Sequence, residues 1–248
     1  MLKNIASTIY SIYALIVFIP ISLVVFILYV IVFGIIPQPK SSRIAHRISQ
    51  VWAHVTYTVL FIRVKIKNKH LIPKEEGVVF ISNHRSLLDV PLWAISTPHV
   101  VKYLSKEEMT KVPVFGYAIK RMYITVNRAD SKDRHLSIIK MVNALKAGTS
   151  IYLAPEGTRN KTKEILLPFK DGAFRMAIAA QAPICVFTLY NTDKLLNPKK
   201  LLSLLPGTIR GTWAEPIYTK GMTENDIPAL REKVRNIMET NYVMMSKL

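Results

Sequence analysis

Residues 78–91 read VVFISNHRSLLDVP, and the pattern of the whole chain can be interpreted outward from this stretch. Its first four residues, 78–81, are apolar and predict a short buried strand. Asp89 and Pro91 favour the first turn of a helix, so a helix is predicted to begin there. The polar loop between these two elements carries His84. Because α/β folds keep their chemistry in loops at strand ends, the stretch predicts an α/β fold and a site.

His84 and Asp89 are the candidate catalytic residues of this loop. An imidazole accepts a proton near neutral pH, and a carboxylate bonded to its other ring nitrogen fixes the tautomer and stabilises the imidazolium. Positions five apart on a continuous helix point about 140° from each other, so the pair needs the turn that the loop supplies. The alternative is that Asp89 is only an N-cap and His84 only a polar loop residue.

Short apolar runs alternate with helical patterns throughout residues 63–248. This alternation predicts an α/β domain with a mixed, largely parallel central sheet flanked by helices. Strands are predicted at 64–67, 78–81, 100–104, 123–126, 150–154, 184–189 and 208–213. Helices are predicted at 92–96, 106–110, 114–121, 131–147, 173–181 and 227–247.

The N-terminal part has a different character. Residues 5–37 contain no charged side chain, and one helix of this length measures about 48 Å against a hydrocarbon thickness of about 30 Å. Pro20 lies near the middle, so a tilted membrane span and a bent helix within one leaflet both fit. Lys40, Arg43 and Arg47 follow the run, which predicts that this side faces the cytoplasm and its anionic lipids.

An amphipathic helix is predicted over residues 41–62, with its apolar face on the membrane or against the following domain. His46 and His54 lie in this segment, and we expect both on the surface. The chain is therefore predicted to consist of a two-helix membrane-attachment module, residues 1–62, and an α/β domain, residues 63–248.

The chain is strongly basic, with 34 Lys and Arg against 16 Asp and Glu and a formal charge of +18. This balance indicates a polyanionic partner: nucleic acid, an anionic membrane or a phosphorylated substrate. The apolar N-terminus favours the membrane, and the sequence carries no RNP, zinc-finger or helix-turn-helix pattern, so no nucleic-acid partner is expected. The single cysteine, Cys185, excludes an internal disulfide and a cysteine-based zinc site, and its apolar surroundings predict a buried, inert thiol.

A second segment also combines apolar and basic residues. Leucines recur through residues 195–205, interspersed with Lys199 and Lys200 and preceded by Lys194. This segment predicts a second membrane-contacting surface, although core packing explains its leucines equally well.

The segment NHRSLLD, residues 83–89, resembles the first motif of the 1-acyl-sn-glycerol-3-phosphate acyltransferase family. Residues 152–159, YLAPEGTR, follow a predicted strand and resemble the F-P-E-G-T-R motif of the same family. Alone, P-E-G-T indicates an ordinary turn. The two motifs together, in this order and spacing, are far more specific, and we expect their loops at the same edge of the sheet.

The resemblance extends to residues that would bind a phosphate group. Lys106, Pro113, Gly116 and Arg128 match the second motif of the family, although in so basic a chain Lys106 and Arg128 can equally be solvated surface charges. Gly157 permits a tight turn, and Arg159 offers a planar fork suited to phosphate. Glu156 is expected to hold a glycerol hydroxyl or orient a basic neighbour. The expected phosphate-binding residues are thus Lys106, Arg128, Glu156, Gly157, Thr158 and Arg159.

The resemblance implies acyl transfer from acyl-CoA or acyl carrier protein to the sn-2 hydroxyl of lysophosphatidic acid, giving phosphatidic acid at the cytoplasmic face of the cell membrane. His84 would remove the proton of the hydroxyl, and Asp89 would orient His84. No G-x-S-x-G elbow or reactive-cysteine setting is present, so an acyl-enzyme is not expected. Neither a metal nor another cofactor is expected.

Three alternatives remain open on the sequence. One is an acyltransferase for another acceptor, such as lysophosphatidylcholine or glycerol 3-phosphate. The second is a membrane-bound lipid thioesterase or hydrolase that uses the same His–Asp pair on water. The third is a non-catalytic protein that binds anionic lipid and for which His84 is dispensable.

Overall fold

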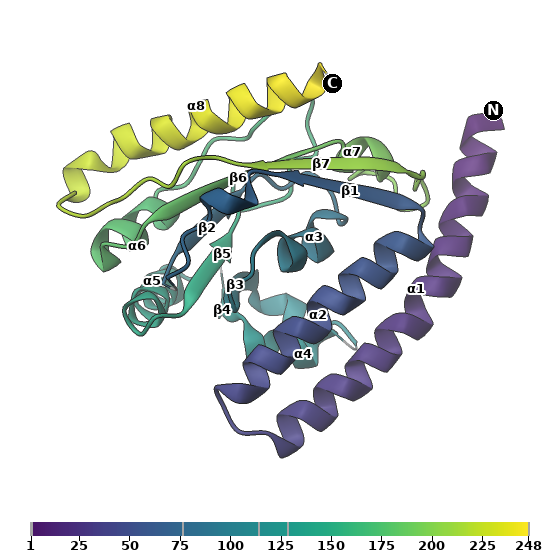
Figure 1. Cartoon of the computed structure of the whole chain (residues 1–248), viewed down its shortest axis with the longest axis horizontal. Helices are drawn as coiled ribbons and strands as arrows, with labels where there is room; N and C mark the ends of the chain where they lie inside the picture. The colour runs from purple at the N-terminus through teal and green to yellow at the C-terminus, as the bar shows by residue number, and fades with distance from the viewer. Residues whose placement is uncertain (1, 76, 114, 128, 248) are drawn as a thin grey trace.

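The computed structural model of the chain describes residues 2–75, 77–113, 115–127 and 129–247. Its centre is a seven-stranded sheet in the order β1-β7-β6-β2-β5-β3-β4 (Figure 1). The strands are β1 Ile62–Lys67, β2 Val79–Ser82, β3 Val101–Lys106, β4 Ile124–Val126, β5 Ser150–Leu153, β6 Ile184–Tyr190 and β7 Gly207–Trp213. Neighbours run parallel except β6 and β7, so β1 and β7 together run opposite to the other strands. The predicted strands and the mixed, largely parallel sheet are confirmed.

The central strands β2, β5 and β6 are buried along their whole length. A parallel strand covered on both faces has no solvent side, which explains the continuous apolar runs of the sequence. Phe80 of β2 lies opposite Tyr152 of β5 and Cys185 of β6. This register brings the carboxyl ends of β2 and β5, and the two motif loops that follow them, to the same edge of the sheet. Cys185 is a buried free thiol, as expected, and burial raises its pKa to about 12.

Helices cover both faces of the sheet (Figure 1). Alternate strand residues pack against α5, α6 and α8 on one face and against α2 and α3 on the other. The predicted segment 106–110 forms a 3₁₀ turn at 107–111, and the short α7 was not predicted because four residues show no helical period. The helices of the domain are α3 Asp89–Ser96, α4 Phe115–Met122, α5 Ser131–Lys146, α6 Gly172–Ala180, α7 Thr192–Leu195 and α8 Ile227–Ser246, with 3₁₀ turns η1 Lys69–Leu71, η2 Glu107–Lys111 and η3 Glu224–Asp226.

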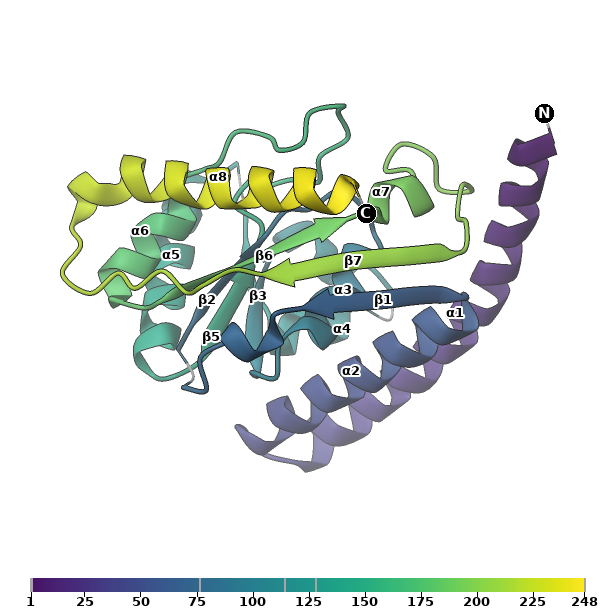
Figure 2. The ribbon, with the colours of Figure 1, turned by 45° about the horizontal axis from the view of Figure 1, so that its top comes forward.

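The N-terminal helices α1, Leu2–Ile35, and α2, Lys40–Val59, lie side by side, and α1 forms the outer layer (Figures 1 and 2). By length and composition α1 is able to cross a membrane, and only 11% of its most apolar window is buried. Tyrosine hydroxyls fasten α1 to the end of α2: Tyr13 donates to the carbonyl of Val59 at 2.8 Å. Large apolar side chains form its exposed face: Ile5, Ile9, Ile12, Ile16, Ile19, Leu23, Val24, Ile27, Leu28, Val30, Ile31 and Ile35.

Two expectations for this part are corrected. The amphipathic helix ends at Val59, and Ile62 already begins β1. His46 is buried, whereas His54 is exposed as expected. The reason is that α2 packs against α3, where the Gln50 amide donates to the carbonyl of Thr97 at 3.2 Å and covers His46. The division of the chain into two domains stays a prediction.

Candidate active site

The loop between β2 and α3 is folded around the Asp89 carboxylate. Asp89 is completely buried, and its Oδ2 accepts hydrogen bonds from His84 Nδ1 at 2.8 Å, Arg85 N at 2.6 Å and Ser86 N at 2.8 Å. Asp89 is the first helical residue rather than the N-cap, and Leu88 takes the cap position. The turn that the His–Asp spacing requires is therefore made by the carboxylate itself, which gathers backbone N–H groups of its own loop.

The His84 ring is held in one tautomer. A carboxylate only accepts, so the neutral imidazole carries its proton on Nδ1 and leaves Nε2 as an acceptor. The His84 side chain is 18% exposed, and within the described part of the chain Nε2 has no hydrogen-bond partner. This arrangement suits a general base that takes a proton at Nε2.

The loop of the second motif, residues 155–160, forms hydrogen bonds with the backbone of His84. The His84 amide donates to Glu156 Oε1 at 3.1 Å, and the His84 carbonyl accepts from Asn160 N at 2.7 Å. The other oxygen of Glu156 accepts from Leu167 N at 2.9 Å. Burial raises the pKa of the Glu156 carboxyl, opposed by these backbone donors and by electrostatic interaction with His84 and Arg85. Both carboxylate oxygens of Glu156 thus bond backbone N–H groups, one of them that of His84.

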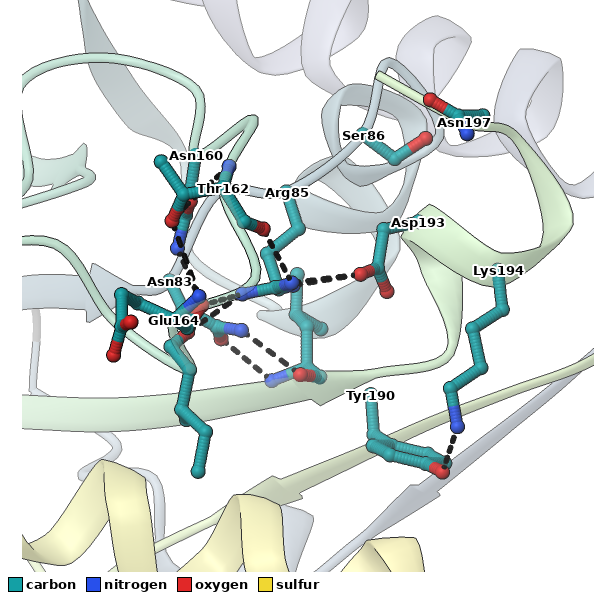
Figure 3. A network of polar contacts seen from close by, with 12 residues as sticks. Asn83, Arg85, Ser86, Asn160, Thr162, Glu164, Tyr190, Asp193, Lys194 and Asn197 are labelled. Atoms are coloured by element: carbon teal, nitrogen blue, oxygen red, sulfur yellow. Dashed lines mark hydrogen bonds and ion pairs between the residues drawn. The ribbon is translucent and has the colours of Figure 1, made fainter. Parts of the chain in front are cut away.

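Arg85 ties the same loop to distant segments (Figure 3). Its guanidinium is buried and donates to the carbonyls of Glu164 and Ile165 at 2.5 and 2.8 Å, and to Asp193 Oδ2 at 2.9 Å. The guanidinium also lies 5.6 Å from the centre of the Tyr242 ring. These contacts join the His84 loop to residues 160–165, α7 and α8. The sequence motif includes Arg85, but nothing in it identifies these partners.

Two further side chains at the site were missed by sequence reasoning. Asn83 continues the pairing of β2 with β6, because its amide accepts from Leu189 N at 2.8 Å and donates to Leu189 O at 2.9 Å. The Trp93 ring lies 5.0 Å from the His84 ring, centre to centre, and stacks on Tyr152 at 5.4 Å. The only sequence signal for Trp93 is its place one turn after Asp89 on α3, which gives α3 an aromatic side chain next to the imidazole.

Arg159 lines a cavity of about 160 Å³ next to the His84 loop. The other lining residues are Leu87, from the His84 loop, and residues of the segment 196–201. Arg159 Nε has no hydrogen-bond partner in the described part of the protein. The guanidinium gives the cavity a cationic wall, so the cavity is suited to an anionic group.

The turn of the second motif is tight and depends on Gly157. Its φ is +69°, in the left-handed region, and an added Cβ would lie 3.0–3.3 Å from the end of the Lys170 side chain. Lys170 therefore lies across Gly157 and brings a further positive charge to this loop. Thr158 is exposed at the same turn.

Of the two predicted phosphate ligands outside the second motif, only Lys106 lies among the described residues. Lys106 is exposed at the carboxyl end of β3, at the same edge of the sheet as His84, but it does not line the cavity of Arg159. Arg128 lies outside the described residues. The described residues include no group of three or more His, Cys, Asp or Glu side chains arranged to hold a metal ion.

Comparison with known proteins gives consistent results. Residues 63–189 match the family model described as Acyltransferase. The chain is 31% identical over 184 residues to the 1-acyl-sn-glycerol-3-phosphate acyltransferase alpha of Mus musculus, covering 73% of this chain and 64% of that protein. It is 28% identical over 191 residues to the corresponding beta enzyme of Homo sapiens, covering 75% and 67%. The chain thus spans about half to two thirds of the length of the curated relatives it matches.

A solved structure shares the fold along nearly the whole chain. It is the crystal structure of the 1-acyl-sn-glycerophosphate (LPA) acyltransferase, PlsC, from Thermotoga maritima, with a TM-score of 0.80. The match covers 99% of this chain and 97% of that chain at 23% sequence identity. The likeness therefore includes the two N-terminal helices as well as the α/β domain.

Proposed function

Because the chain belongs to the acyltransferase family, we propose that it transfers a fatty acyl group from acyl-CoA or acyl carrier protein to the sn-2 hydroxyl of 1-acyl-sn-glycerol-3-phosphate. The product is phosphatidic acid. The observation that carries this proposal is the His84 ring, which is bonded through Nδ1 to buried Asp89 and has Nε2 free for an incoming hydroxyl. The names of the curated relatives support the choice of acceptor.

In the proposed reaction, His84 Nε2 takes the proton of the sn-2 hydroxyl while its oxygen attacks the thioester carbonyl. Asp89 stabilises the imidazolium that forms. Collapse of the tetrahedral intermediate breaks the C–S bond, and the imidazolium returns its proton to the departing thiolate. A positioned general base of this kind contributes about 10²–10⁴-fold to the rate.

Arg159 is the proposed ligand of the acceptor phosphate, because its side chain lines the cavity beside the His84 loop and its Nε has no hydrogen-bond partner among the described residues. A guanidinium binds phosphate oxygens with strong, charge-assisted hydrogen bonds. Gly157 and Thr158 shape the same turn, while Lys106 and Arg128 remain proposed phosphate ligands from the next strands.

For membrane attachment, the contacts of α1 favour embedding in one leaflet. Near one end, Ser11 Oγ accepts from Leu204 N at 2.9 Å, and at the other end Arg121 donates to the carbonyl of Phe33 at 3.4 Å. A helix held at both ends by the same domain lies along that domain, with its exposed apolar face toward lipid. We place the α/β domain at the cytoplasmic face, on the basis of the cations after α1.

The proposal is tested by following thioester consumption and phosphatidic acid formation with lysophosphatidic acid, using wild type and His84→Ala. We expect product with wild type and loss of at least about 10²-fold with His84→Ala, while membrane binding persists. Thioester loss without acylated lipid would instead identify a hydrolase. Equal activity of the two proteins would remove His84 from the mechanism.

A further inference from the structure

The cavity beside Arg159 has a second wall that belongs to none of the matched motifs. Four of its lining residues come from the segment that follows α7: Leu196, Asn197, Pro198 and Lys199, with Leu201 completing the wall. The remaining lining residues are Leu87 and Arg159. At about 160 Å³ the cavity is larger than a single water molecule requires, so it has room for a small polar headgroup.

This wall is attached directly to the His84 loop. Ser86 Oγ donates to the carbonyl of Leu196 at 3.0 Å, and Leu87 lies between His84 and Asp89 in the sequence. Arg159 belongs to the loop that forms hydrogen bonds with the backbone of His84. A headgroup in the cavity would therefore be bound beside the loop that carries His84.

The wall is rigid, although it lies in a loop. Asn197 Oδ1 accepts from Lys199 N at 2.8 Å, and Asn197 N donates to Ser203 Oγ at 3.0 Å. Pro198 restricts the backbone between them. A loop held in this way fixes the backbone of Lys199 at the cavity before any ligand binds, which reduces the entropy cost of ordering the loop.

The same loop reaches the membrane-attachment helix (Figure 2). Leu204 N donates to Ser11 Oγ of α1 at 2.9 Å, and Leu201, on the cavity wall, is 64% exposed. A lipid acceptor that leaves the bilayer along α1 would thus contact Leu201 first and then Lys199 of this loop.

The charges of the cavity are of one sign. Arg159 and Lys199 line it, and among the described residues no Asp or Glu does. Asp193, the second residue of α7, is bonded to Arg85 instead. A phosphomonoester carries about −1.5 to −2 charges at neutral pH, so two cations match it better than one. A choline phosphodiester has one negative charge and a quaternary ammonium, which two cations repel.

We propose that Lys199, which lines the same cavity as Arg159, is a second phosphate ligand that makes the site selective for acceptors bearing a phosphomonoester. This inference rests on the proposed function and adds a specificity-determining residue to it. Lys200 is the matched control, because it is an exposed lysine next in the chain but does not line the cavity.

The experiment compares steady-state kinetics of wild type, Lys199→Ala, Lys199→Arg and Lys200→Ala, each with lysophosphatidic acid and with lysophosphatidylcholine. We expect Lys199→Ala to raise KM for lysophosphatidic acid about 10-fold with kcat changed less than about 2-fold, since the variant loses one charge-assisted hydrogen bond to the phosphate. Lys199→Arg should restore most of the loss, and Lys200→Ala should behave as wild type. The preference for lysophosphatidic acid over lysophosphatidylcholine should fall with Lys199→Ala.

A binding arm separates this inference from the proposed function. Equilibrium binding of lysophosphatidic acid to the full chain in neutral detergent micelles, without thioester, should weaken about 10-fold with Lys199→Ala. If wild type binds this lipid in a Lys199-dependent way but transfers no acyl group, the proposed function fails and the cavity assignment stands. If Lys199→Ala and Lys200→Ala are equivalent in both arms, the inference is wrong.

Discussion

At the scale of single residues, the proton in the proposed mechanism has one acceptor, His84 Nε2, because Nδ1 is bonded to Asp89. In Asp89→Asn an amide oxygen in the place of Oδ2 could still accept from His84 Nδ1 and from the backbone of Arg85 and Ser86, because all three donors bond the same oxygen. The neutral amide would lack the negative charge that stabilises the imidazolium formed during proton transfer. We expect kcat to fall about 10²–10⁴-fold with a melting temperature close to that of wild type, as measured by turnover and thermal unfolding. A variant that keeps a tenth of the activity would contradict the role assigned to the charge of Asp89.

Glu156→Gln separates positioning from substrate binding. Glu156 accepts from His84 N and Leu167 N, and a glutamine can accept at only one of its two terminal atoms. We expect kcat to fall and the free energy of unfolding to drop by about 1–3 kcal/mol, with KM for lysophosphatidic acid nearly unchanged. A rise in KM alone would show that Glu156 holds the acceptor.

Site residues were predictable where they lie close together in the sequence and were not where they lie far apart. His84 and Asp89 belong to one motif, and Glu156 and Arg159 belong to a second. The family resemblance was therefore enough to predict that the two loops meet at one edge of the sheet, while the roles of these residues stay predictions. The partners of Arg85 come from residues about 80 and 108 positions away, and only the packed fold brings them together. Lys199 and the cavity likewise depend on a loop without a motif.

At the scale of elements, the contact between α2 and α3 makes the protein sensitive to acid. His46 is buried there, and its pKa is lowered to about 4, first by desolvation and further by the charge of His99, against a backbone hydrogen bond with Thr97. The unfolded chain has a histidine pKa of about 6.5, so between pH 6.5 and 4 it binds a proton that the folded protein does not. Stability from this residue is therefore present above pH 6.5 and is lost as the pH falls toward 4.

The corresponding measurement is thermal or denaturant unfolding in detergent at several pH values. Over the window from pH 6.5 to 4, we expect His46 to account for a loss of about 3 kcal/mol in the free energy of unfolding. His46→Gln should reduce this loss, and His54→Gln, on the exposed face of the same helix, should leave it unchanged. Identical pH profiles for wild type and His46→Gln would rule out this origin.

The elements themselves were predictable where burial leaves a pattern. Strands β2, β5 and β6 are covered on both faces and therefore appear as apolar runs. Their order in the sheet was not predictable, nor was the reversed direction of β1 and β7, because both follow from long-range pairing. His46 was placed on the surface by mistake because its helix has neighbours on more than one side.

At the scale of the whole molecule, the exposed face of α1 is expected to carry most of the membrane affinity. Ile16 on α1 and Tyr218 in the α/β domain are equally exposed, at 66%. Ile16→Glu should weaken binding to phosphatidylglycerol-containing vesicles at least about 10-fold, because a charge in the apolar layer costs about 2.5–3.5 kcal/mol. Tyr218→Glu, with the same change in net charge, should bind almost as wild type in a flotation assay. Equal effects of the two variants would show that overall charge, rather than α1, determines attachment.

Cys185 is the single cysteine of the chain and its thiol is buried, so the unmodified protein is not expected to react with thiol-labelling reagents. With its pKa raised to about 12 and its side chain inside β6, it offers no thiolate to a maleimide in the folded state. A cysteine introduced at Ile5, near the start of α1, or at Gln38, just after its end, would then be the only reactive thiol. Both positions are exposed. A membrane-impermeant reagent that reaches both positions from one side of a sealed vesicle would report a helix lying in one leaflet. Labelling from opposite sides would report a helix that crosses the bilayer.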